Sequence, residues 1–182
     1  MLFNLFGKKD KGHDGRIFKD VVWAGTEQKY HALKKILQQD KEVLFVAWFP
    51  ATVKVFREYL QQEDPEQSNV LEAKFVHSNH VQGRKVIFIE HYPLHEKEIA
   101  FAQSLNLTEA VVYSALDEPF FKHLGSDKVI PMMKMMGMKE DEAIEHSMVT
   151  KAIMNGQDKF AAKVSVDQAA NSQEEWIVKN LK

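Results

Sequence analysis

The sequence predicts an α/β fold, in which a parallel sheet is flanked by helices and followed by a helical C-terminal extension. Apolar runs of strand length alternate with amphipathic segments of helix length from Val21 to Leu116. One run, KEVLFVAWF at 41–49, is apolar almost throughout, as is typical of a strand buried on both faces. Strands separated by helices of this length indicate repeated β-α units in a parallel sheet. After about Asp117 no further strand candidate occurs.

The first half of the predicted sheet has two strands, each followed by a helix. The short apolar run 21–23 precedes a predicted helix over 26–39, with Thr26 as a candidate N-cap. One stripe of this helix is apolar: Tyr30, Leu33, Ile36 and Leu37. The strand 41–49 precedes a predicted helix over 51–62, whose apolar positions are Val55, Phe56, Tyr59 and Leu60.

The second half of the sheet contains three further strand candidates. We expect strands over 70–76, 85–92 and 110–116, and a loop over 77–84 joins the first two of them. A helix over 94–106 separates the last two strands. These elements complete a five-stranded parallel sheet.

The C-terminal extension is helical in its spacing. Residues 119–138 suggest two short helices, with Ser126 capping the second. Beyond them, apolar or small residues recur every four positions: Met148, Ala152, Gly156, Phe160 and Val164. Such an amphipathic helix needs a surface to pack on. A last helical turn is expected around Trp176.

The expected organisation has three parts: a flexible N-terminus over 1–16, an α/β domain over 17–125 and the helical extension over 126–182. The apolar run at the start of the N-terminus is too short to span a bilayer, which takes about 20 residues. A peripheral membrane contact through this segment stays open, because three lysines follow its apolar residues.

The composition of the chain argues against several classes of protein function. Net charge is -2 in 182 residues, so no general attraction to nucleic acid is expected. Cysteine is absent, which excludes disulfide frameworks, thiolate zinc sites and cysteine nucleophiles. The absence of cysteine fits a cytoplasmic protein. The helical stripe from Met148 to Val164 is expected to cover the chain's own sheet or to pack on a partner protein, including a second copy of the chain.

Most of the eight methionines lie between Met132 and Met154, at helical spacing. Methionine fills irregular gaps between helices, so packing is the first interpretation, and a hydrophobic docking surface including Met132 and Met136 is the second. A methionine metal site usually adds imidazole or thiolate ligands, and only His146 is close in sequence. No metal is expected here.

The run over 114–153 contains GSDKVI, MMGMKEDEAIEH and MVTKAI in that order. It resembles SecA, the ATPase motor of bacterial preprotein translocation, at the junction of its second nucleotide-binding domain with its helical scaffold. The layout of strands and helices upstream is similar to the opening of that domain. The resemblance implies a RecA-like, P-loop NTPase-like α/β domain followed by a scaffold helix.

The departures from this family concern catalysis. ATP hydrolysis needs a G-x-x-x-x-G-K-[ST] loop that cradles phosphate, and this chain has none. The family's second motor domain also supplies arginines that stabilise the transferring phosphoryl group, whereas the matching segment 94–110 contains no arginine. Ser147 replaces the family's proline after E-H. The chain is therefore predicted to be no enzyme and to hold no cofactor.

Seven residues are candidates for a partner or ligand surface: Trp48, Phe49, His91, Asp117, Phe120, Met132 and Met136. Several lie where predicted strands end, which is where open α/β sheets bind ligands. His91, with His77, His80 and His95, also suggests a metal site, but their spacings are weak and solvated histidines are expected instead.

Two functions remain. The first is a non-catalytic SecA-like domain that acts as a protein-interaction module, with a link to protein translocation that rests on the resemblance. The alternative is a nucleotide- or small-molecule-binding domain that uses the C-terminal edge of its sheet, with Trp48, Phe49, His91 and Asp117 as ligand contacts.

Overall fold

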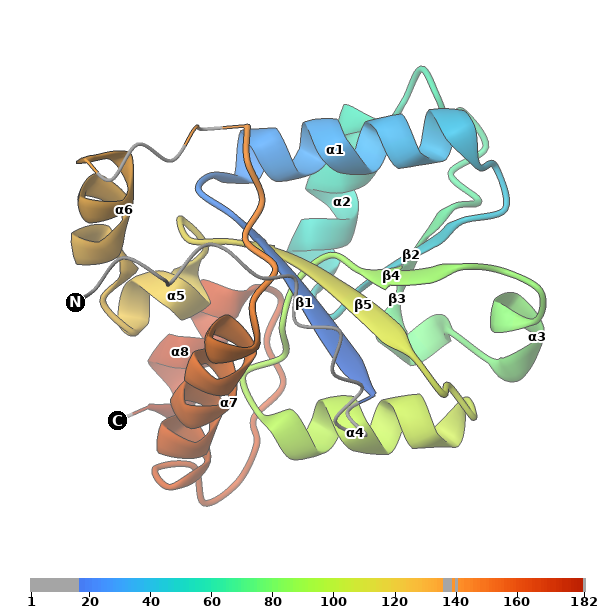
Figure 1. Ribbon diagram of the computed structural model, residues 1–182. Helices are drawn as coiled ribbons and strands as arrows, with labels where there is room; N and C mark the ends of the chain where they lie inside the picture. The colour runs from blue at the N-terminus through green and yellow to red at the C-terminus, as the bar shows by residue number, and fades with distance from the viewer. Residues whose placement is uncertain (1–16, 136–138, 140, 182) are drawn as a thin grey trace.

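The computed structural model describes residues 17–135, 139 and 141–181, without the side chains of residues 132–134. Its centre is a five-stranded parallel sheet with strand order β1-β5-β4-β2-β3 (Figure 1). The strands are β1 (Phe18–Trp23), β2 (Leu44–Ala47), β3 (Val70–Glu72), β4 (Val86–Phe88) and β5 (Ala110–Ala115).

Helices cover both faces of this sheet (Figure 1). On one face, α1 (Thr26–Gln39) and α2 (Pro50–Tyr59) bury Leu33 and Phe56 against Phe45 of β2. On the other face, α4 (His95–Ser104) buries Ala102 against Phe88 and Val112. The side chains of β2 alternate between the two cores, and both are apolar, which explains the continuous apolar run in the sequence.

The C-terminal extension packs over the carboxyl ends of the strands. It contains α6 (Ser126–Met135), α7 (Ser147–Ala161) and α8 (Gln173–Asn180), and α5 (Pro119–His123) leads into it. A third apolar cluster joins these helices to the sheet: Val22, Phe49, Leu116, Phe120, Phe121, Ile153, Phe160 and Trp176. On α7 the buried residues include Ile153, Gly156 and Phe160, which face the chain's own sheet and α5. Met148 and Ala152 of the predicted stripe are exposed instead.

The predicted fold class is confirmed: a RecA-like α/β sheet flanked by helices precedes C-terminal helices. The division into parts at residue 125 stays a prediction. Of the described helices, none combines the length and hydropathy that spanning a bilayer requires.

Several element boundaries differ from the prediction. The run 70–76 forms a strand only to Glu72, because a 3-10 turn at Ala73–Phe75 (η1) follows. The predicted loop after it contains a single helical turn, α3 (Ser78–Val81). Ile144 pairs antiparallel with Val22 through hydrogen bonds of 2.8 and 3.0 Å, so the edge of β1 is partly covered by a segment that we expected to lack strand character.

Candidate functional site

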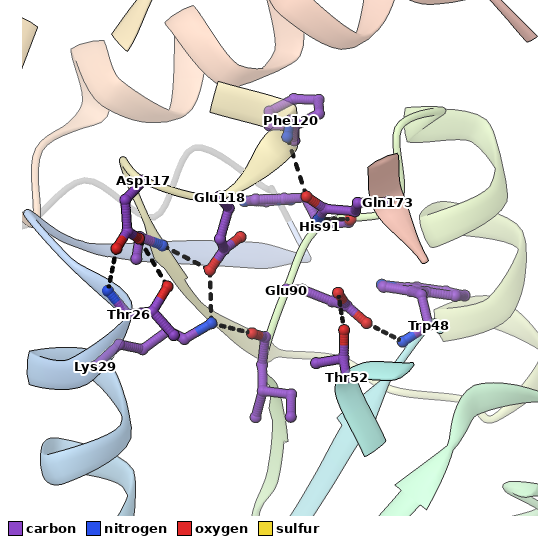
Figure 2. A network of polar contacts seen from close by, with 12 residues as sticks. Thr26, Lys29, Trp48, Thr52, Glu90, His91, Asp117, Glu118, Phe120 and Gln173 are labelled. Atoms are coloured by element: carbon purple, nitrogen blue, oxygen red, sulfur yellow. Dashed lines mark hydrogen bonds and ion pairs between the residues drawn. The ribbon is translucent and has the colours of Figure 1, made fainter. Parts of the chain in front are cut away.

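The candidate site is the carboxyl edge of the sheet, where open α/β folds bind ligands. Three strand ends meet there: the segments after β2, β4 and β5. Figure 2 shows that polar side chains from these segments and from α1 point toward one another. The arrangement is mostly interior: Lys29, Glu90, His91 and Glu118 are all buried.

The N-terminus of α1 binds the carboxylate of Asp117. Asp117 accepts the backbone N–H of Thr26 at 3.0 Å and the Thr26 hydroxyl at 2.7 Å (Figure 2). Gly25, not the predicted Thr26, is the N-cap residue and has no side chain to cap the helix. Helix N-termini attract anions. The carboxyl group of Asp117 therefore takes the place that a bound anion would take at the N-terminus of α1.

The N-terminus of α2 binds the carboxylate of Glu90 in the same way. Glu90 accepts the backbone N–H groups of Trp48 at 2.8 Å and Phe49 at 3.0 Å, and the Thr52 hydroxyl at 2.7 Å. Burial raises the pKa of Glu90 to about 7; the Thr52 hydrogen bond opposes the rise, and the nearby charge of Glu118 adds to it. The C-terminal extension binds one more N–H group of this helix end: the carbonyl of Asn171 accepts the N–H of Ala51 at 2.9 Å.

Lys29 lies between these two helix ends. Its ammonium donates to Glu118 at 2.5 Å and to the carbonyl of Ile89 at 2.7 Å. Glu118 also accepts the N–H of Ala115. Burial raises the pKa of Glu118, although the charge of Lys29 opposes the rise.

His91 lies between two buried carboxylates. Its Nδ1 is 3.0 Å from Glu98, and its Nε2 is 3.1 Å from Asp20. Burial alone would lower the pKa of His91, but the charge of Glu98 and the contact with Asp20 outweigh it and raise the pKa to about 10. Burial alone would raise the pKa of Glu98, but the charge of His91 lowers it to about 2. The expectation of a solvated histidine is therefore wrong for His91.

The extension closes this edge with its own polar contacts. From α7, Gln157 donates to Glu98 and to the carbonyl of Tyr92, each at 2.8 Å. From α8, Gln173 donates to the carbonyl of His91 at 3.0 Å and accepts the N–H of Phe120 at 3.0 Å (Figure 2). The edge is thus filled and covered by the chain itself.

The seven candidate residues have different environments. Phe49, His91 and Phe120 are buried, so a partner could contact them only if the covering helices moved. Trp48 and Asp117 are partly exposed. Met132 belongs to α6, but its side chain is not described, and Met136 lies outside the described residues.

The structure brings five of these candidates together at one edge: Trp48, Phe49, His91, Asp117 and Phe120. Sequence reasoning missed Lys29 and Asp20, whereas it had placed Glu98 near His91. Lys29 left a signal, because it stands four residues before Leu33 on the buried stripe of α1. In the described chain, no group of three or more His, Asp or Glu side chains is arranged to hold a metal ion.

Part of the chain is similar to curated SecA proteins, whereas no protein-family model matches it. It is 40% identical over 73 residues to the protein translocase subunit SecA of Acidithiobacillus ferrooxidans, an alignment that covers 36% of this chain and 8% of that protein. It is 45% identical over 51 residues to SecA of Acinetobacter baumannii, covering 28% of this chain and 6% of that protein. The match thus spans less than a tenth of these relatives. It supports a SecA-like relationship for part of the chain.

Proposed function

We propose, from the similarity of part of the chain to SecA, that it is a cytoplasmic, non-catalytic domain that binds protein and is linked to protein translocation. The observation that carries the proposal is the state of the carboxyl edge. The N-termini of α1 and α2, which open onto it, are bound by the chain's own carboxyl groups, those of Asp117 and Glu90.

These carboxylates oppose nucleotide binding at this edge. A phosphate would have to take over the N–H groups of Thr26 or Phe49 and displace the carboxyl side chains that bind them. It would also have to displace the buried side chain of Trp176 and the contacts of Gln173. No observation at this edge favours the alternative of a nucleotide or small-molecule site.

A groove along the free edge of β3 supports the protein-binding part of the proposal. Its volume is about 330 Å³, and its lining residues are Pro50, Val53, Lys54, Arg57, Glu58, Gln67, Glu72 and Phe75. Phe75 is 57% exposed, which is high for a phenylalanine in a folded chain. Arg57 donates to the carbonyl of Val70 through two nitrogens, at 2.6 and 3.1 Å. Because Arg57 covers this strand edge, a partner would meet side chains here rather than open backbone.

Nucleotide binding is the first test. We expect no heat of binding and no stabilisation on adding ATP or ADP with magnesium, and no phosphate release, while full-length SecA gives all three signals in parallel. A ligand that binds only the folded form raises the melting temperature. Stabilisation by several degrees would favour the alternative function, and turnover abolished by substituting one of the chain's own residues would overturn the proposal.

Protein binding is the second test. Sedimentation of the purified chain measures self-association, and affinity capture with extract measures retained protein. We expect Phe75→Ser to weaken the association that is observed. Val178→Ser is the matched control, because Val178 is also exposed but lies on α8, away from the groove. A single monomeric species that retains no protein would contradict a protein-binding role.

A further inference from the structure

Residues 165–181, here called the strap, cross the carboxyl edge of the sheet after α7 and end with α8. In the described chain, one backbone hydrogen bond joins the strap to the rest of the molecule, from the Ala51 N–H to the Asn171 carbonyl. No strand ladder runs through it. The strap is otherwise attached through side chains, chiefly those of Trp176 and Gln173, so its separation would leave the backbone pairing of the sheet in place.

A tryptophan anchors the strap. Trp176 is fully buried, and its ring lies 6.0 Å from the ring of Tyr92 and 6.3 Å from that of Phe160. Its indole N–H donates to Asp167 at 2.8 Å, and the Tyr92 hydroxyl donates to the same carboxylate. A buried aromatic anchor with its polar atom satisfied is the pattern of a hot spot at a protein–protein interface.

The side chain of Gln173 hydrogen-bonds to the backbone beneath the strap. Its amide NH₂ donates to the carbonyl of His91, and its amide oxygen accepts the N–H of Phe120. These two groups belong to the segments after β4 and β5. One side chain therefore recognises two segments of the carboxyl edge through main-chain groups, as in the recognition of a bound peptide.

We propose that the strap is an internal pseudo-ligand, occupying a docking site for a helical segment of a partner protein that carries Gln and Trp three residues apart. This inference rests on the proposed protein-binding function and adds to the groove beside Phe75 a second, covered docking site at the carboxyl edge. A partner must displace the strap before it reaches the aromatic floor of the site, which includes Phe49 and Phe120. A tethered competitor acts at an effective concentration of about millimolar, so it weakens partner binding without any change in the site itself.

The probe for this inference is a fluorescent peptide of residues 165–182, SVDQAANSQEEWIVKNLK, which contains the strap and the residue after it. Its anisotropy is followed on titration with the full chain and with the full-chain variant Trp176→Ala. The variant loses its internal anchor but keeps the pocket. We expect it to bind the peptide at least about tenfold more tightly than the unmodified chain does.

Two controls accompany the titration. The variant Val178→Ala changes an exposed residue of the same helix, and it should bind no better than the unmodified chain. A peptide in which alanine replaces the tryptophan should bind none of these chains, because it lacks the anchor.

Gln173→Ala is a second loosening variant, for the case that Trp176→Ala fails to fold. Circular dichroism establishes which variants are folded. The inference is overturned if folded Trp176→Ala or Gln173→Ala binds the peptide no more tightly than the unmodified chain. That result would leave the proposed function standing, since sedimentation, capture and nucleotide titration of the unmodified chain test it separately.

Discussion

Lys29 donates to Glu118 across 2.5 Å in an interior where both residues are almost inaccessible to solvent. The pair joins the first turn of α1 to the segment that follows β5. Such a buried pair adds little stability over an apolar pair of the same size, but the loss of one partner is costly.

Lys29→Met should therefore destabilise the protein strongly, by about 3–5 kcal/mol, because it leaves Glu118 buried without a cation. The measurement is the free energy of unfolding in urea at pH 7. In the double variant Lys29→Met/Glu118→Leu most of this loss should be recovered. Equal stabilities for the single and double variants would show that the buried charge is not the cause.

Stability should depend on pH through His91 and Glu98. The pKa of Glu98 is lowered from 4.5 to about 2, so its contribution is present above pH 4.5 and is lost as the pH falls toward 2. The pKa of His91 is raised from 6.5 to about 10, so its contribution is complete below pH 6.5 and is lost as the pH rises toward 10. We expect the unfolding free energy to be greatest between these two ordinary values.

The variant His91→Gln should lose the part of the alkaline decline that His91 causes. His95→Gln is the matched control, because His95 lies 3.7 Å from the same Glu98 but is partly exposed. The measurement is the free energy of unfolding in urea between pH 6 and pH 10. If this free energy declined in His91→Gln with the same slope as in the unmodified chain, His91 would not be the cause of the alkaline decline.

Glu90 should add a separate pH dependence. Its pKa is raised from 4.5 to about 7, so the folded state holds this proton more tightly than the unfolded state, and stability falls as the pH rises from 4.5 through 7. Glu90→Gln can still accept the N–H groups of Trp48 and Phe49 but cannot ionise. The variant should therefore lose less stability than the unmodified chain between pH 5 and pH 7. Parallel curves for the two proteins over this interval would rule out a titrating Glu90.

The contact between α7 and α5 depends on a glycine. A Cβ at Gly156 would clash with Cδ1 of Leu124 and would lie 3.2 Å from its Cδ2. Gly156→Val should destabilise the protein by about 1–3 kcal/mol through overpacking, despite the poor helix propensity of glycine. A double-mutant cycle with Leu124→Ala measures the coupling, and purely additive losses would place the cause elsewhere.

The fold class follows from the sequence because burial acts on each element locally. The helix at Thr26–Gln39 has the predicted bounds, because the residues that form its apolar stripe all lie within that stretch. Strand ends were predicted less well. The run 85–92 forms a strand only over Val86–Phe88, because Glu90 and His91 turn away into contacts with α2, α4 and α8.

The polar edge could be predicted only in part. Asp117 and His91 were candidates because they lie where predicted strands end, and both lie at this edge. Their partners come from distant segments: Asp117 binds Thr26, which is 91 positions away, and Gln173 binds His91, which is 82 positions away. No local pattern records a pairing at such a separation.

The sequence by itself determined that β-α units form a covered parallel sheet, that helices follow it, and that part of the chain resembles SecA without the phosphate-binding loop of that motor. Only the tertiary structure decided that the carboxyl edge is filled by Asp117 and Glu90 and closed by Trp176. The physical reason is that apolar periodicity acts within one element. The free-energy cost of burying a charge is instead offset by distant groups, which only the fold brings within hydrogen-bonding distance.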